Sequence, residues 1–391
     1  MNILLIHNAY TTFGGEDKVV ENITKILKEK GHQIYLFKRD SAEITNTPIG
    51  NVRAFFSGIY SWKSKQTVRR YIKEFKPDVV HIHNLYPLIS PSILGECRDS
   101  GVPVVMTVHN FRLICPNGLF LTKGQICEKC SGGREYWCVF RNCESNLLKS
   151  FGYALRNIIA RKRKFFLDNV TIYICLTEFQ KQRFVQEGFP KDKIIVIPHM
   201  IDIEGINYPK ATGEYVGYIG RISTEKGLPV LIEAARICED IQFKAAGSYN
   251  QHPELHDNAP QNFEFCGSLK NGLLDKFYTN SRFIVVPSIW YEVFGLVVLE
   301  AMIRGKVVIC SRIGGLPELV DDGVTGLLFE PSNAKELAEK IRYLWDRPQL
   351  CKKMGEAGRE KAIQLYSPDK YYKSLMAVYE KAIEITNKAI N

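Results

Sequence analysis

The most informative absence in this 391-residue sequence is that of a long hydrophobic run. No stretch of about 18 apolar residues occurs, so we predict no membrane-spanning helix. Residues Met1 to His7 also lack the basic start and long apolar segment of a signal peptide, and are expected to form a first strand. We therefore expect a cytoplasmic protein, either soluble or peripheral at the inner face of the cell membrane.

Other signals of function are missing as well. The Gly-x-Gly-x-x-Gly fingerprint of dinucleotide-binding enzymes does not follow the first strand, which speaks against an NAD-dependent enzyme. Gly14 and Gly15 stand there instead, before a helix expected over Asp17–Lys30. Such a pair is either a plain tight turn or a place where a phosphate or sugar approaches the backbone. No helix-turn-helix, zinc-finger or RNA-binding motif accompanies the basic residues, so no nucleic acid partner is expected.

Strand-like and helix-like segments alternate along the chain, which indicates parallel sheets and the α/β class. A chain of this length exceeds the usual size of one domain, so we expect two Rossmann-like, doubly wound domains. The expected strands are Asn2–His7, Gln33–Lys38, Val79–His83, Val104–Val108 and Ile172–Leu176 in the first domain, and Tyr215–Gly220, Gln242–Ala246, Phe263–Phe265, Phe283–Val286 and Val307–Cys310 in the second.

One run in the second half carries two carboxylates in a pattern that suits a sugar nucleotide. Glu292 and Glu300 stand eight residues apart, on either side of Gly295. A helix that starts near Gly295 would place both acids beside its N-terminus, where free N–H groups attract phosphate. The carboxylates would then accept hydrogen bonds from sugar and ribose hydroxyls. Two solvated helix acids are the alternative.

A second motif brings two cations to the end of a strand. Arg221 follows Tyr215–Gly220, and Lys226 and Gly227 precede a helix expected over Leu228–Ile237. Open α/β sheets bind ligands at the carboxyl ends of their strands. Arg221 would grip a diphosphate through two parallel hydrogen bonds, and Lys226 would add a mobile charge. A solvated basic turn is the alternative.

Together the two motifs resemble the donor domain of family-4 retaining glycosyltransferases, of the kind that assembles bacterial polysaccharides. The family pattern is a Gly-Arg…Lys-Gly loop followed by a Glu, seven residues and a second Glu, and this sequence reads EVFGLVVLEA over residues 292–301. The resemblance implies the GT-B fold, in which two Rossmann-like domains face each other across a cleft. Residues 1–200 would be the acceptor-side domain, 201–366 the nucleotide-sugar donor domain, and 367–391 a helix that crosses back to the first domain.

The resemblance also implies an activity. A sugar would pass from a nucleoside diphosphate sugar to a glycan or lipid-linked acceptor, with retention of anomeric configuration, in cell-surface polysaccharide synthesis. The leaving diphosphate would act as base, and no catalytic metal is expected. An epimerase that uses the same donor and a non-catalytic sugar-nucleotide-binding scaffold are the alternatives. The implied catalytic residues are His109, Arg221, Lys226 and Glu292, and the implied donor contacts are Gly14, Gly15, Arg221, Lys226, Phe294, Gly295, Leu296 and Glu300.

A one-sided charge distribution marks residues 145–166. No acid occurs between Glu144 and Asp168, whereas six lysines and arginines do. Apolar residues recur there at helical spacing, which predicts an amphipathic helix with a basic edge. Such a helix either lies on an anionic membrane surface or packs on the core with its basic edge in water.

The 11 cysteines fall into two groups. Those beside apolar segments, such as Cys175 and Cys310, are expected to be small buried hydrophobes in a reducing compartment. The others lie in a long insert, 115–143, which has little predicted secondary structure and would need a cross-link to be ordered. A structural zinc held by Cys115, Cys127, Cys130 and Cys143, with Cys138 spare, is one hypothesis. Free thiols, and disulfides or redox chemistry, are the alternatives.

Overall fold

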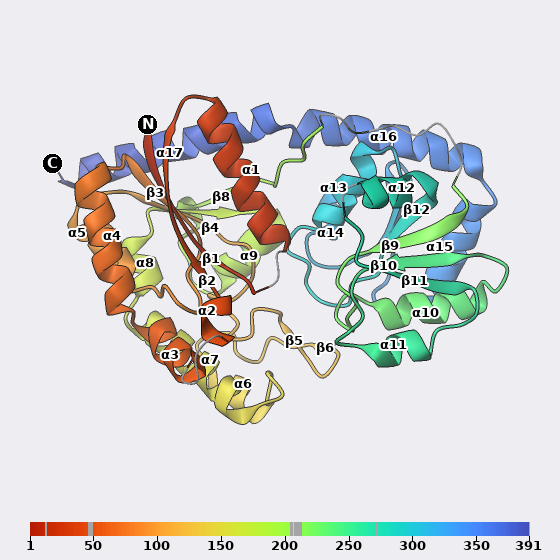
Figure 1. The fold of residues 1–391 in the computed structure, drawn as a ribbon, viewed down its shortest axis with the longest axis horizontal. Helices are drawn as coiled ribbons and strands as arrows, with labels where there is room; N and C mark the ends of the chain where they lie inside the picture. The colour runs from red at the N-terminus through yellow and green to blue at the C-terminus, as the bar shows by residue number, and fades with distance from the viewer. Residues whose placement is uncertain (12–13, 46–49, 204–205, 207–212, 271, 391) are drawn as a thin grey trace. The chain divides into compact units, whose positions relative to one another are not determined.

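The computed structural model describes residues 1–391 except 12–13, 46–49, 204–205, 207–212, 271 and 391. This chain divides into two compact units, each with its own parallel sheet (Figure 1). Unit 1 consists of Met1–Phe120, Cys127–Pro198 and Asp369–Asn391, and unit 2 of Leu121–Ile126 and His199–Pro368. Residues 204–205 and 207–212, which follow the domain boundary expected between residues 200 and 201, lie outside the described residues.

Unit 1 is built on a six-stranded sheet in the order β2-β1-β3-β4-β7-β8, with each neighbouring pair parallel. The strands at its centre are buried along nearly their whole length, as expected for a parallel sheet covered on both faces. Because β1 lies between β2 and β3, the chain changes direction there, and the sheet has a topological switch point between β1 and β3. The strands are β1 (Asn2–Ala9), β2 (Gln33–Asp40), β3 (Val79–Asn84), β4 (Val104–Thr107), β7 (Ile172–Cys175) and β8 (Ile194–Val196).

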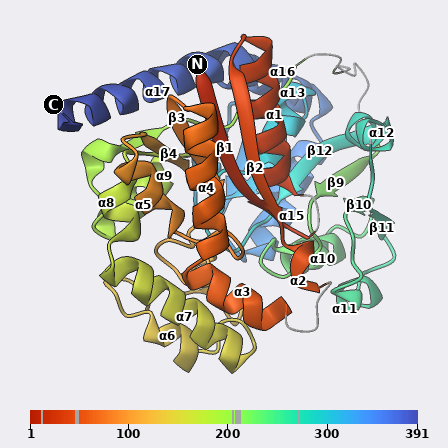
Figure 2. The same ribbon diagram turned by 60° about the vertical axis from the view of Figure 1, so that its left-hand side comes forward.

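Helices connect these strands. In α7, the Asn146 side chain accepts a hydrogen bond from the Lys149 N–H, and basic residues fill the last turn, which suits the negative end of the helix dipole. Figures 1 and 2 both show α3, α6 and α7 side by side at one end of unit 1, where α7 contacts the other two. The helices are α1 (Gly15–Glu29), α2 (Ala42–Thr45), α3 (Gly50–Ile59), α4 (Trp62–Phe75), α5 (Ile93–Asp99), α6 (Tyr136–Phe140), α7 (Leu147–Lys162), α8 (Phe165–Asn169), α9 (Glu178–Gln186) and the 3-10 helix η1 (Lys191–Lys193).

The last helix, α17 (Pro368–Ile390), packs on unit 1 although it ends the chain. The Tyr379 hydroxyl lies 2.7 Å from Nδ1 of His81, inside β3, and the Lys30 ammonium donates to Asp369 at 2.9 Å. The predicted return of the C-terminal helix to the N-terminal domain is therefore confirmed. No described helix is both long and apolar enough to cross a bilayer.

Unit 2 also has a six-stranded parallel sheet, with a different strand order in which two strands lie on the far side of its first strand. Its parallel sheet has the order β11-β10-β9-β12-β13-β14, so its switch point lies between β9 and β12. The strands are β9 (Tyr215–Ile219), β10 (Phe243–Ala246), β11 (Phe263–Gly267), β12 (Ser281–Val286), β13 (Val308–Ser311) and β14 (Gly326–Phe329). The helices are α10 (Leu228–Ile237), α11 (Pro253–Asp257), α12 (Gly272–Asn280), α13 (Leu296–Ile303), α14 (Leu316–Leu319), α15 (Ala334–Trp345) and α16 (Pro348–Tyr366); a short antiparallel pair, β5 (Leu121–Thr122) and β6 (Gln125–Ile126), is grouped with them.

Candidate functional site

The two charged motifs meet at the switch point of unit 2, at the carboxyl ends of β9 and β12. Gly227 precedes α10 with a φ of 75°, and a Cβ at this position would lie 1.7 Å from the carbonyl oxygen of Pro287. The Ile289 N–H donates to the Glu225 carbonyl at 3.0 Å. Only glycine fits where the two loops approach so closely, and their backbones hold each other in place.

An ion pair between Lys226 and Glu292 lies at the centre of this site. Lys226 Nζ lies 2.5 Å from Glu292 Oε1, and the Ser288 hydroxyl donates to the same oxygen at 2.8 Å. The Glu292 side chain is only 8% exposed, and the ammonium lies 5.0 Å from the centre of the Trp290 ring. A largely buried carboxylate with two donors is fixed in one position, so the site presents a cation and an acceptor side by side.

Two glycines that the sequence reasoning missed pack against the backbone of Glu292. Gly314 has a φ of 60°, and a Cβ there would lie 2.4 Å from the carbonyl oxygen and 2.6 Å from the nitrogen of Glu292. The Gly315 N–H donates to the same carbonyl at 2.7 Å. The available signal was a Gly-Gly pair soon after the strand ending in Ser311, the same pattern that Gly14-Gly15 forms after the first strand.

Arg221 is the most exposed of the predicted donor residues in this loop. Its guanidinium is 58% exposed and lies 2.5 Å from a carboxylate oxygen of Glu225, a partner that the sequence reasoning did not name. Burial acts to raise the pKa of Glu225, but Arg221 and nearby hydrogen bonds outweigh it and hold that pKa below its usual value. Glu225 therefore stays charged and aims Arg221 without burying it.

The helix start predicted at Gly295 is confirmed. Gly295 has a φ of 95° and α13 begins at the next residue, Leu296. Glu300 lies inside this helix and accepts a hydrogen bond from the Tyr278 hydroxyl at 3.0 Å, so the two glutamates have different partners. Phe294 is 3% exposed and packs edge-on against His199, which leaves mainly its backbone available to a ligand.

The predicted residues of the first domain lie in unit 1. His109 follows β4, and its Nε2 is 3.0 Å from Nδ1 of His83, at the end of β3. Gly14 is the N-cap of α1, and its N–H donates to Asp17 at 3.0 Å. An N–H at the helix N-terminus that a phosphate would use is thus already bonded to a carboxylate.

The cysteines of the insert lie close together around α6 and α7. Cys130 and Cys138 form a small apolar cluster with Ala154, against which Trp137, Val139 and Cys143 pack. The Arg161 guanidinium adds an ion pair to Glu135 at 2.7 Å. Packing and ion pairing therefore account for the order of this loop.

The described residues give the zinc hypothesis no support. They contain no group of three or more His, Cys, Asp or Glu side chains arranged to hold a metal ion. The Cys115 thiol donates to Asn117 at 3.0 Å, and burial raises its pKa to about 11. A hydrogen bond with Cys143, together with burial, raises the pKa of Cys138, which favours the thiol over the thiolate at this position. Cys127, Cys130 and Cys143 form no disulfide.

Comparison with known proteins identifies the family. Residues 13–204 match the model described as Glycosyltransferase Family 4, and residues 202–361 match Glycosyl transferases group 1. Alpha-maltose-1-phosphate synthase of Mycobacterium tuberculosis is 31% identical over 324 residues, which is 78% of this chain and 79% of the relative. The chain belongs to the glycosyltransferases.

Another sequence relative and two solved structures are also similar to this glycosyltransferase. An uncharacterized 42.6 kDa protein in the cps region of Klebsiella pneumoniae is 25% identical over 351 residues, covering 82% of this chain and 87% of that protein. Sucrose-phosphate synthase from Thermosynechococcus elongatus superimposes with a TM-score of 0.72 at 19% identity, over 98% of this chain and 99% of that one. The Anabaena protein HepE, solved with UDP and glucose, superimposes with a TM-score of 0.67 at 17% identity. The match covers 97% of this chain and 100% of HepE. The fold is GT-B.

Proposed function

We propose that this glycosyltransferase moves a sugar from a nucleoside diphosphate sugar to a glycan or lipid-linked acceptor, with retention of anomeric configuration, in cell-surface polysaccharide synthesis. The observation that carries the proposal is the Lys226–Glu292 pair at the switch point of unit 2. A nucleoside diphosphate sugar needs a cation for its diphosphate and an acceptor for its sugar hydroxyls, and these two groups are adjacent here. The UDP and glucose bound by HepE and the cps-region protein of Klebsiella point the same way.

Donor binding would exchange the partners of this pair. A diphosphate carries more negative charge than one carboxylate, so it would draw the Lys226 ammonium away from Glu292. Glu292 would then accept a hydrogen bond from the sugar. Arg221, exposed and aimed by Glu225, would hold the other side of the diphosphate. The free N–H groups at the start of α13 would stabilise the charge that grows as the diphosphate departs.

The remaining predicted residues take supporting roles in the proposal. Glu300 would bind the ribose, and the backbone from Phe294 to Leu296 would approach the phosphates. From unit 1, His109 would contact the transferred sugar, and Gly14 and Gly15 would allow close approach of the donor.

A lipid-linked acceptor would agree with an apolar face on unit 1, and we propose an anionic membrane surface at the inner face of the cell membrane as its partner. The face spans α3, the start of α4, α6 and α7 (Figure 2). Phe140 is 78% exposed and Leu148 82% exposed. Residues 134–164 around them contain eight basic and two acidic residues, a balance that anionic lipids complement. The exposed apolar residues of this face are Phe56, Tyr60, Trp62, Tyr136, Phe140, Leu147, Leu148 and Phe151.

A donor screen tests the proposal. Thermal unfolding is measured with UDP-, GDP-, ADP- and dTDP-sugars, because a ligand at 100 times its Kd adds about 2.7 kcal/mol to the free energy of unfolding. The stabilising donor is then incubated with lipid-linked and free glycans, and the anomeric configuration of the product is read by NMR. Absence of stabilisation by every sugar nucleotide, or a product of inverted configuration, would contradict the proposal.

A further inference from the structure

Two arginines and two tyrosines gather where neighbouring strands of unit 1 end. Tyr10 comes after β1, Tyr86 after β3 and Arg112 after β4, and these three strands are adjacent in the sheet. Cζ of Arg112 lies 5.4 Å from the centre of the Tyr10 ring, and Cζ of Arg156, on α7, lies 4.0 Å from the centre of the Tyr86 ring. Open parallel sheets bind their ligands at the carboxyl ends of the strands, so this cluster occupies a place suited to a ligand.

Arg156 is a buried cation without a negatively charged partner. It is 6% exposed, and its Nη2 donates to the Pro116 carbonyl at 3.1 Å and to Asn157 Oδ1 at 3.2 Å. It forms no ion pair with any residue that the structure describes. Neutral acceptors and the faces of aromatic rings hold a guanidinium in place without cancelling its charge. Unit 1 therefore contains an uncompensated positive charge close to these strand ends.

Arg112 places a second positive charge beside the first. Its backbone carbonyl accepts a hydrogen bond from Asn157 Nδ2 at 2.7 Å, and a Cβ on Gly118 would lie 2.6 Å from its Cγ, so the stem of the side chain is confined. The residue is half-buried, and its guanidinium has no hydrogen-bond or ion-pair partner within the described part of the chain. Burial lowers the pKa of Arg156 and the nearby Arg112 adds to this effect, because the two like charges repel each other.

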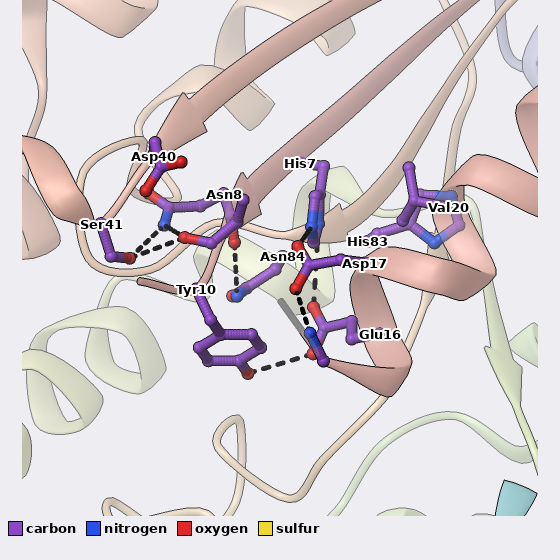
Figure 3. A network of polar contacts seen from close by, with 12 residues as sticks. His7, Asn8, Tyr10, Glu16, Asp17, Val20, Asp40, Ser41, His83 and Asn84 are labelled. Atoms are coloured by element: carbon purple, nitrogen blue, oxygen red, sulfur yellow. Dashed lines mark hydrogen bonds and ion pairs between the residues drawn. The ribbon is translucent and has the colours of Figure 1, made fainter. Parts of the chain in front are cut away.

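Two acids act electrostatically on one or both of these arginines, but neither supplies a free negative charge. Glu144 already forms an ion pair with Lys149 at 2.7 Å. Glu16 accepts a hydrogen bond from the Tyr10 hydroxyl at 3.0 Å (Figure 3). Burial raises the pKa of Glu16 to about 8, although Arg112 lowers it, so this carboxyl is protonated at neutral pH.

Tyr153, on α7, adds a hydroxyl that can bind a ligand. Its ring centre lies 4.6 Å from Cζ of Arg156, and it acts electrostatically on both arginines. Its hydroxyl forms no hydrogen bond with a described residue. The available donors are thus the Arg112 guanidinium and the Tyr153 hydroxyl, and the net charge around them is positive. A phosphate group suits this combination, because arginine binds phosphate through two parallel hydrogen bonds.

The helices next to Arg156 also carry exposed apolar side chains. A Cβ on Gly58 of α3 would lie 3.8 Å from Cδ of Arg156, and Leu148 and Phe151 of α7 are 82% and 50% exposed. Eight residues of a helix rise about 12 Å, so this length of α7 separates Leu148 from Arg156. A ligand that joins a phosphate to an apolar chain could therefore contact both features.

We propose that Arg112 and Tyr153 bind the phosphate group through which the acceptor glycan is joined to its lipid, with Arg156 as a buried second charge. This inference rests on the proposed function, and it assigns a site for one part of the acceptor within unit 1. Arg112 would donate two hydrogen bonds to phosphate oxygens, and Tyr153 would donate one. The bound phosphate would offset two positive charges that otherwise repel each other, so its binding would stabilise the folded protein.

The test measures the binding of farnesyl diphosphate, a short lipid diphosphate, by isothermal titration calorimetry. Every protein compared carries Arg221→Ala and Lys226→Ala, which remove the proposed donor site as a second place for a diphosphate. In this background Arg112→Gln should weaken binding by about tenfold or more, as expected for the loss of hydrogen bonds to a charged group. Arg98→Gln is the matched control, since this arginine is 58% exposed on α5 of the same unit. Equal affinity in Arg112→Gln and the parent protein, or an equal loss in Arg98→Gln, would overturn the proposal.

A second ligand distinguishes a lipid-linked phosphate from a free one. Inorganic diphosphate offers the same oxygens without an apolar chain, so it should bind at least about tenfold more weakly than farnesyl diphosphate. Equal affinities of the two ligands would assign the site to a free phosphate, and would overturn the assignment to the acceptor lipid.

Thermal unfolding without ligand separates a binding role from a structural one. Because Arg112 is an unpaired charge that repels Arg156, Arg112→Gln should have a Tm equal to or above that of the wild type. A Tm several degrees below the wild type would show that the arginine holds the fold together, and would overturn the proposal. Failure of the proposed function would look different: the wild type would transfer no sugar from any donor, while farnesyl diphosphate still bound through Arg112.

Discussion

At the scale of single residues, the proposed donor site is a set of paired charges that a ligand would rearrange. Lys226 pairs with Glu292, and Arg221 pairs with Glu225. Each cation is fixed in position before any diphosphate arrives, which lowers the entropy lost on binding. Each carboxylate neutralises its cation while the site is empty. The cations in turn offset the negative charge of the acids, which would otherwise repel the donor.

Lys226→Ala should lower kcat by roughly two orders of magnitude, about 2.7 kcal/mol, because the ammonium stabilises charge that grows on the diphosphate. The measurement is the rate of sugar transfer at saturating donor. Lys335→Ala, an exposed lysine on α15 of the same unit, is the control and should be unaffected. Thermal unfolding of both variants separates a loss of chemistry from a loss of fold. Equal rates in Lys226→Ala and wild type would remove this residue from the mechanism.

Substitutions of Glu292 and Glu300 should have different effects, one on sugar transfer and the other on nucleotide binding. Glu300→Gln should weaken the binding of free nucleoside diphosphate, since the proposed ribose contact is present in that ligand. Glu292→Gln should leave this binding nearly unchanged and impair transfer, because its proposed partner is the sugar. Calorimetric titration with the nucleotide alone, followed by transfer kinetics, measures both effects. Identical losses of nucleotide binding in the two variants would contradict the assignment.

At the scale of elements, α7 has two different faces. Its inner side packs closely, because a Cβ on Gly152 would lie 2.8 Å from the Phe55 ring of α3. Its N-terminal end carries Leu147 and Leu148 into solvent. In the proposed function this exposed apolar end would contact the membrane, and the basic residues of the same segment would favour anionic lipids.

Leu148→Glu combined with Phe140→Glu should weaken binding to vesicles that contain phosphatidylglycerol by tenfold or more. Each burial of a large apolar side chain is worth about 1.5–3 kcal/mol, and the new charges repel the lipid. Co-sedimentation with vesicles measures the effect, with pure phosphatidylcholine as the neutral surface. Leu273→Glu is the matched control, since this leucine is 60% exposed on α12 of unit 2. Equal binding by the double variant, or an equal loss in Leu273→Glu, would exclude this face.

At the scale of the whole molecule, each unit has a parallel sheet with a switch point beside its first strand, and the two switch points carry opposite chemistry. Unit 2 places cations there, and unit 1 places acids around a histidine. The buried acid has a consequence for stability. Because the folded pKa of Glu16 lies near 8 and above its unfolded value, the folded state binds more protons between those two values. Stability is therefore highest below the unfolded pKa and falls as the pH rises toward 8.

Glu16→Gln should remove this dependence, since glutamine resembles the protonated acid at every pH. As the pH rises from 5 to 8, the Tm of the variant should rise relative to that of the wild type. The corresponding change in the free energy of unfolding is at most about 1.4 kcal/mol per pH unit. Thermal unfolding across this range measures it. Parallel curves for the two proteins would show that Glu16 is not protonated in the folded state.

The sequence by itself determined the class of fold and the position of its local signals. Alternating strands and helices predicted both parallel sheets, and Gly295 predicted the start of α13, because periodicity and glycine conformation are properties of short segments. The return of the last helix followed from family resemblance and is present as α17. The strands β8 and β14 were not predicted, although four-residue strands such as β4 and β7 were.

Only the tertiary structure decided which charged groups meet. Lys226 and Glu292 are 66 residues apart in the chain, and their contact depends on how β9 and β12 lie side by side in the sheet. The acids around His7 follow from the register of α1 against β1, and the thiols of the insert find packing partners on α7 that a cysteine count cannot reveal. Strand order and register are set by the burial of both faces of a sheet, which is a property of the whole unit and not of any one segment.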